Sequence, residues 1–145
     1  IPPEAHANCQ LRYVVGTKEN DIIPALRRHL DKTGFSMVSI EDSKRGDLGA
    51  SRLDPNDPWV KWCENSLCQT TKKSISVLPN LGGSLPNDIF SVEMGLRTIW
   101  IPHSYAACSQ HAPNEHLLGS IAREGLAMMA GLFWDLGHTE KLPEL

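Results

Sequence analysis

An α/β fold is predicted for this 145-residue chain. Short stretches rich in β-branched and aromatic residues alternate with longer stretches whose apolar residues recur at helical spacing. Hydrophobic residues make up 41% of the chain and charged residues 21%, the balance of a globular protein rather than a disordered chain or a coiled coil. Strands that alternate with helices indicate a parallel sheet covered by helices.

The first three elements form a predicted strand, helix and strand. Residues 5–15 alternate between apolar and polar positions, the period of a half-buried strand, which turns Arg12 away from the core. Residues 20–34 have a helical apolar face, and residues 35–40 form a second strand. The expected landmarks of the helix are Asn20 or Asp21 as its cap, Pro24 in its first turn and Gly34 at its end.

A polar, glycine-bearing stretch over residues 41–57 follows, and it indicates a domain boundary near residue 46. The elements expected after it are a helix that begins at Pro58 behind an Asp57 cap, a strand at 75–78, a helix at 87–94 ended by Gly95, a strand at 98–101 and a helix at 114–136. The apolar stripe of the helix at Pro58 comprises Trp59, Val60, Cys63 and Leu67.

Charge and cysteine content indicate which binding partners and which cellular compartment to expect for this protein. A net charge of −3 without a basic stripe argues against nucleic acid and anionic membranes as partners. The longest apolar run, residues 126–134, is far shorter than the roughly 20 residues that span a bilayer, and no signal segment opens the chain. Four cysteines without a CxxC pair are expected to be free, mostly buried thiols. These features predict a cytoplasmic protein, and a start at Ile1 suggests a fragment of a longer one.

The densest chemical cluster is the loop "HSYAACSQHAPNEH" at residues 103–116, placed where a predicted strand ends. Ligands of open parallel sheets bind at such ends. His111, Glu115 and His116 resemble a string of zinc ligands, but Pro113 breaks the helix that would bring them together. His111 is therefore predicted either as a single ligand or catalytic residue completed from elsewhere, or as a histidine at a helix start.

The loop "GGSLP", residues 82–86, has two interpretations. Gly82, Gly83 and Ser84 can offer backbone amides and a hydroxyl to a carboxylate, or they can form a tight turn without a ligand. A nucleophilic serine is disfavoured because the loop lacks the G-x-S-x-G pattern. Arg12 can grip a substrate carboxylate through two parallel hydrogen bonds, or it can be a solvated strand residue.

Three separated stretches, "IPPEAHANCQLRYVVG", "GGSLP" and "QHAPNEHL", together resemble one family in the right order. The family is that of the zinc aminoacylases and carboxypeptidases, which includes carnosinase-like dipeptidases, acetylornithine deacetylase and succinyl-diaminopimelate desuccinylase. The resemblance implies that residues 1–46 are the C-terminal half of a small α+β lid or dimerisation domain. Residues 47–145 would then be the C-terminal part of a catalytic domain, a mixed sheet with helices on both faces.

The resemblance also implies a function and its residues. Arg12, Gly82, Gly83 and Ser84 would bind the substrate, a small peptide or an N-acyl amino acid, and His111 would be a zinc ligand. The intact enzyme would use two zinc ions, or other divalent metals, to activate water and cleave an amide bond next to a free carboxylate. It would be a dipeptidase or deacylase that forms homodimers.

The family's other metal ligands and its general base do not occur in this sequence, and the usual proline of the first motif is Val15 here. No catalytic residue is therefore expected within the chain, which alone should be inactive without the upstream part of the protein. The alternative is a non-catalytic dimerisation or ligand-binding module.

Overall fold

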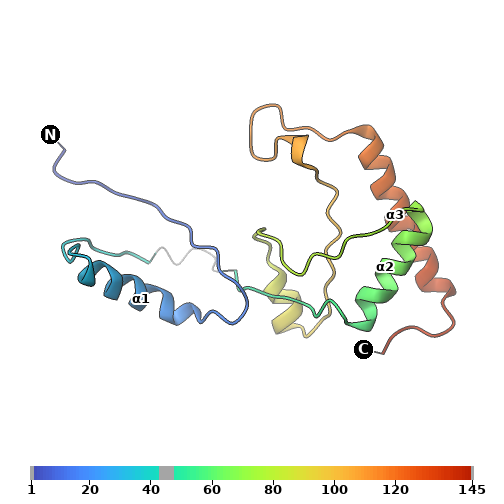
Figure 1. Cartoon of the computed structure of the whole chain (residues 1–145), viewed down its shortest axis with the longest axis horizontal. Coiled ribbons are helices and arrows are strands. Elements are labelled where there is room, and N and C mark those ends of the chain that lie inside the picture. Colours follow the sequence, from blue (N-terminus) through green and yellow to red (C-terminus); the bar gives the residue numbers. More distant parts are fainter. Residues whose placement is uncertain (1, 43–47, 145) are drawn as a thin grey trace. The chain divides into compact units, whose positions relative to one another are not determined.

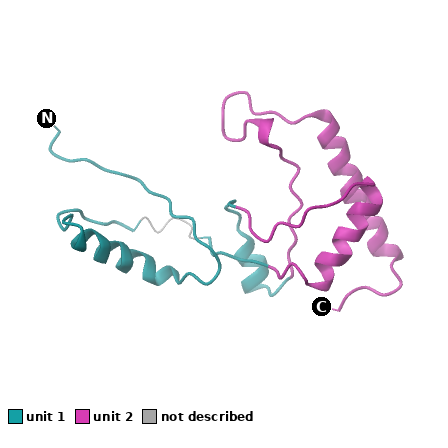
Figure 2. Ribbon diagram, viewed as in Figure 1, with its two compact units in different colours: residues 1–52, 82–96 teal, residues 53–81, 97–145 magenta. Residues whose placement is uncertain are grey.

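The computed structural model describes residues 2–42 and 48–144. These fall into two compact units, one formed by residues 1–52 and 82–96 and the other by residues 53–81 and 97–145 (Figure 2). Unit 1 contains α1 (Glu19–Lys32) and a one-turn π-helix, η1 (Ile89–Glu93). Unit 2 contains α2 (Pro58–Thr71), the 3₁₀ turn η2 (Ala106–Cys108) and α3 (Gly119–His138), as Figure 1 shows.

The predicted α/β fold is wrong, because the described residues contain helices and no strand. The mixed sheet with helices on both faces and the α+β lid are wrong for the same reason. A strand exists only where its backbone amides and carbonyls pair with a neighbouring strand, and alternation in one segment does not supply that neighbour. The segments predicted as strands, residues 5–15, 35–40, 75–78 and 98–101, have no regular secondary structure.

α1 confirms the helix predicted in the first part of the chain, but its beginning differs. Lys18 is the N-cap and makes no side-chain cap bond, so the predicted caps Asn20 and Asp21 are wrong. Pro24 lies inside the helix rather than in its first turn. The helix ends as predicted, because Gly34 follows the last turn with a φ of 88°.

The end of α1 is held by hydrogen bonds typical of a glycine-terminated helix. The amide of Phe35 donates to the carbonyl of Leu30 at 2.8 Å, and the amide of Gly34 donates to that of Asp31 at 3.4 Å. Arg27 on the same helix donates to the carbonyl of Val38 at 2.6 Å. No residue of α1 is buried, and hydrogen bonds from Arg27 to the carbonyls of Phe35 and Val38 join residues 35–38 to this helix.

α2 begins where the sequence predicts. The carboxylate of Asp57 accepts a hydrogen bond from the amide of Trp59 at 2.9 Å, and Pro58 occupies the first helical position. Three members of the predicted apolar stripe, Val60, Cys63 and Leu67, are buried. α2 packs against α3, which makes this helix pair the core of unit 2.

α3 begins at Gly119, later than the predicted position 114, because Asn114 has a left-handed φ of 63° that a helix cannot continue from. The helix predicted over residues 87–94 is reduced to η1, which Gly95 follows with a φ of 64°. The predicted boundary near residue 46 lies outside the described residues.

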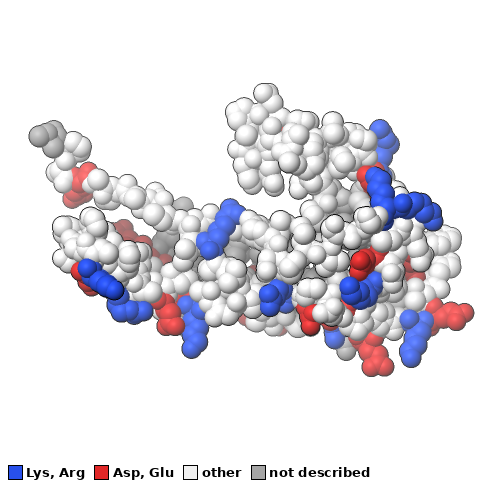
Figure 3. All heavy atoms as spheres, viewed as in Figure 1, with Lys and Arg blue, Asp and Glu red and all other residues white. Residues whose placement is uncertain are grey.

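The cysteines are free, as predicted, although only Cys63 and Cys108 are buried, while Cys68 is half-buried and Cys9 exposed. Burial raises the pKa of the Cys63 thiol. Among the described residues, no helix combines the length and the apolar character needed to cross a bilayer. Basic and acidic side chains are interspersed on the face of the described residues seen in Figure 3.

Candidate functional site

Arg12 and the glycine loop, predicted separately as substrate-binding residues, meet in unit 1. Nη1 of Arg12 donates a hydrogen bond to the carbonyl oxygen of Gly82, across 70 positions of sequence. Gly83 and Ser84 follow directly and are exposed, as Arg12 is. We call Arg12 with residues 82–84 the arginine–loop pair.

The two glycines of the loop are not required by its backbone conformation. Neither Gly82 nor Gly83 has a positive φ, unlike Gly16, Gly34 and Gly95. A Cβ atom added at either loop glycine would meet nothing within 4 Å, so the space beside both is open. A bound group can therefore approach the backbone here, and the conformation of the loop does not itself require glycine.

The arginine–loop pair has the chemistry to hold a carboxylate. A guanidinium carries five N–H donors in a rigid fork, and the bond to Gly82 uses one nitrogen of that fork. The remaining donors match the two oxygens of a carboxylate. The hydroxyl of Ser84 and the amides of the loop can donate to the same anion.

Sequence reasoning missed two hydrogen bonds made by residues that follow the loop of the arginine–loop pair in the chain. The amide of Gly49 donates to Oδ2 of Asp88 at 2.9 Å, and Nδ2 of Asn87 donates to the hydroxyl of Ser51 at 2.7 Å. Both bonds join segments more than 35 residues apart. No local pattern indicates such pairs, and the only sequence signal was an Asn-Asp dipeptide at a predicted helix start.

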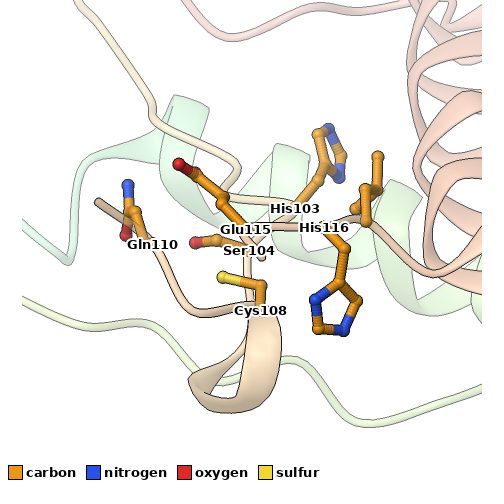
Figure 4. Close-up of a pocket in the computed structure, with 7 residues that line it drawn as sticks. His103, Ser104, Cys108, Gln110, Glu115 and His116 are labelled. Carbon is orange, nitrogen blue, oxygen red and sulfur yellow. The ribbon is translucent and has the colours of Figure 1, made fainter. Parts of the chain in front are cut away.

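A second cluster lies in unit 2, in the loop that the sequence singled out. An open hollow of about 460 Å³ is found there. The imidazoles of His103 and His116 point away from one another (Figure 4). The residues that line the hollow are His103, Ser104, Cys108, Gln110, Glu115, His116 and Leu117.

His111, the predicted metal ligand, directly follows Gln110 in the chain but does not line this hollow. Its backbone has a left-handed φ of 62°, and its amide donates to the carboxylate of Glu115 at 3.3 Å. The turn is closed by the amide of His116, which donates to the carbonyl of Cys108 at 3.0 Å. The histidine is therefore exposed on a turn rather than at a helix start, so the helix-start alternative is wrong.

The described residues do not by themselves fit a zinc ion. A catalytic zinc needs three protein ligands, and no group of three or more His, Cys, Asp or Glu side chains suited to a metal occurs within residues 2–42 and 48–144. His111 offers one imidazole, and the carboxylate of its neighbour Glu115 is bound to the His111 amide.

His103 is a further residue that sequence reasoning did not single out. Its Nδ1 is buried and has no hydrogen-bond partner among the described residues. A Cβ atom at Gly125 of α3 would lie 2.7 Å from this nitrogen, so glycine is needed there for the imidazole to pack against the helix.

No family model, curated protein or solved structure matches this chain. The interpretation of both clusters therefore depends on their own chemistry and on the three sequence motifs that they contain.

Proposed function

We propose that this chain is the C-terminal portion of a zinc-dependent metallopeptidase or amidohydrolase. Its substrate is a dipeptide or an N-acyl amino acid, and the bond cleaved is the amide next to a free carboxylate. The observation that carries the proposal is the hydrogen bond between Arg12 and Gly82. It joins two of the three motifs whose order suggested this class of enzyme.

Within this proposal, the arginine–loop pair binds the carboxylate end of the substrate. The guanidinium of Arg12 binds the two carboxylate oxygens, and its bond to Gly82 fixes its direction. The open space beside Gly82 and Gly83 admits the substrate backbone, and Ser84 donates a further hydrogen bond. Anchoring one end of the substrate in this way sets the position of the amide to be cleaved.

His111 supplies one zinc ligand in this proposal, and other divalent metals can replace zinc. The remaining ligands and the general base come from the upstream part of the same protein. The chain alone is accordingly inactive. The free thiols support a reducing, cytoplasmic location.

The proposal is tested with the intact enzyme and the 145-residue chain assayed side by side on dipeptides and N-acetyl amino acids, with zinc measured in both. Activity and about two zinc ions are expected only in the intact enzyme. His111→Ala should lower both the zinc content and the activity, whereas His6→Ala, at an exposed histidine of unit 1, should change neither. An intact protein that retains its zinc and activity after His111→Ala contradicts the metal assignment.

A non-catalytic dimerisation module is the second candidate. It is favoured by the apolar side chains that the N-terminal segment exposes, Leu11 at 62% and Val14 at 65%. The proposed enzyme also dimerises, so dimerisation alone does not separate the two candidates. Sedimentation of the intact protein decides together with the assay, because a dimer without hydrolysis of any tested substrate supports the module and a hydrolytic dimer supports the enzyme.

A further inference from the structure

Two hydrogen bonds fasten the segment at residues 49–51 to the start of η1. The amide of Gly49 donates to Oδ2 of Asp88 at 2.9 Å, and Nδ2 of Asn87 donates to Oγ of Ser51 at 2.7 Å. Both bonds are partly buried, so water competes for them less than at an exposed site. We call these four residues the clasp.

The clasp leaves too little space for a side chain at position 49. A Cβ atom at this position would lie 3.1 Å from Oδ2 and 3.2 Å from Cβ of Asp88. The second of these atoms is close to the backbone and cannot turn aside as a flexible chain end does. Gly49 therefore permits the backbone to approach Asp88 closely enough for the hydrogen bond.

The clasp lies close to both members of the arginine–loop pair. On one side, Tyr13 directly follows Arg12. Its hydroxyl donates to the carboxylate of Glu19 and lies 3.3 Å from the carbonyl oxygen of Leu48, one residue before Gly49. On the other side, Asn87 comes three residues after Ser84 in the same segment. Tyr13, Gly49 and Asp88 line a common hollow of about 550 Å³.

We propose that Asn87 and Asp88 are positioning residues, which hold residues 82–84 at the distance from Arg12 that a substrate carboxylate requires. This inference depends on the proposed function, because it concerns the same substrate site. The two side chains do not touch the substrate. They act through the segment at residues 49–51, which they bind just after the loop and which lines the same hollow as Tyr13, the neighbour of Arg12.

The experiment compares Asp88→Ala with Asp88→Asn in the intact enzyme on an N-acetyl amino acid. Asp88→Ala should raise KM about tenfold with kcat changed less than twofold, because a displaced loop would lose about one hydrogen bond to the substrate carboxylate. Asp88→Asn should restore KM, because its amide oxygen accepts from Gly49 as the carboxylate does. Asn87→Ala should behave as Asp88→Ala does. A merely structural role would lower kcat through loss of folded enzyme and leave KM unchanged.

Hydrogen exchange gives a readout that needs no activity. Asp88→Ala should speed deuterium uptake both in residues 48–52 and in residues 80–86, and Asp88→Asn should speed neither. Faster uptake in residues 48–52 alone would overturn the inference, because the loop would then be independent of the clasp.

The inference and the proposed function fail in different ways. A wild-type enzyme that hydrolyses no tested substrate overturns the proposed function and with it the role in substrate binding. An active enzyme in which Arg12→Gln raises KM but Asp88→Ala does not overturns the inference alone.

Discussion

Different interactions stabilise each of the two units internally. In unit 2, α2 and α3 bury apolar side chains against each other, with Leu67 only 5% exposed. In unit 1, α1 has no buried residue, and side-chain hydrogen bonds such as those of Arg27 and Asp88 join the segments. Substitutions in unit 2 should therefore change the free energy of unfolding, whereas those in unit 1 should change ligand binding.

The helix pair of unit 2 also contains polar contacts that fix its register. The hydroxyl of Ser66, a buried residue of α2, donates to the carboxylate of Asp135 on α3 at 2.6 Å. Gly131 of α3 lies against Thr70 of α2. Because all four tryptophans belong to unit 2, their fluorescence reports the unfolding of this unit and not of unit 1.

The largest effect is expected for Leu67→Ala. Removing this buried side chain should lower the free energy of unfolding of unit 2 by about 2–5 kcal/mol. The measurement is urea denaturation followed by tryptophan fluorescence. Leu126→Ala on α3, whose side chain is 73% exposed, is the control and should change the free energy by less than about 0.5 kcal/mol. Equal losses in the two variants would mean that Leu67 does not lie in the interface.

A smaller loss is expected for Gly131→Ala. The new methyl group would lie 2.2 Å from Oγ1 and 3.1 Å from Cβ of Thr70, so the helices must move apart at a cost of about 1–3 kcal/mol. Gly137→Ala in the same helix meets no atom within 4 Å and should stabilise unit 2 by up to about 1 kcal/mol through helix propensity. Thermal melts of the two variants should shift in opposite directions. Adding Thr70→Ala to Gly131→Ala should recover part of the loss.

Asp57→Ala should destabilise α2 by about 1 kcal/mol, because it removes the side chain that caps the helix. Asp57 also forms an ion pair with Nε of Arg97 at 3.0 Å. Asp57→Asn keeps an oxygen for the amide of Trp59 and loses only the charge. In urea denaturation, Asp57→Asn should lower the free energy of unfolding much less than Asp57→Ala does. Equal losses in the two variants would mean that the ion pair with Arg97, and not the helix cap, accounts for the destabilisation.

The smallest effect concerns the pH dependence of unit 2. Since burial raises the pKa of the Cys63 thiol, the folded state holds this proton more tightly than the unfolded state. The resulting stability is fully present below the unfolded pKa of about 8.5 and is lost as the pH rises through the folded value. Cys63→Ala should therefore flatten the fall in urea midpoint above about pH 8.5, and Cys9→Ala, at an exposed thiol of unit 1, should not.

The three α-helices were predictable from sequence, whereas the predicted sheet is absent from the described residues, for a physical reason. The Asp57-Pro58 start of α2 and the Gly34 end of α1 are decided by contacts within a few residues. A strand depends on a partner from elsewhere in the chain, which the alternating pattern of residues 5–15 cannot specify. The late start of α3 likewise depends on the backbone conformation of Asn114.

The candidate site was predictable in its parts but not in its connections. Arg12 and the loop at residues 82–84 were identified from side-chain chemistry and motif order. Their hydrogen bond, like that between Gly49 and Asp88, joins distant segments for which neither partner carries a local signal. His111 was singled out from the sequence. His103 was missed because the burial of its ring nitrogen results from packing against α3, which the sequence does not show.

The most direct test of carboxylate binding by the arginine–loop pair uses two matched substrates. The measurement is kcat/KM of the proposed intact enzyme for an N-acetyl amino acid and for its C-terminal amide, with wild type and Arg12→Gln compared. If Arg12 binds the carboxylate, Arg12→Gln should lower kcat/KM for the acid by about 10- to 100-fold and leave that for the amide nearly unchanged. An equal loss on both substrates would contradict the account, because Arg12 would then act on folding rather than on the carboxylate.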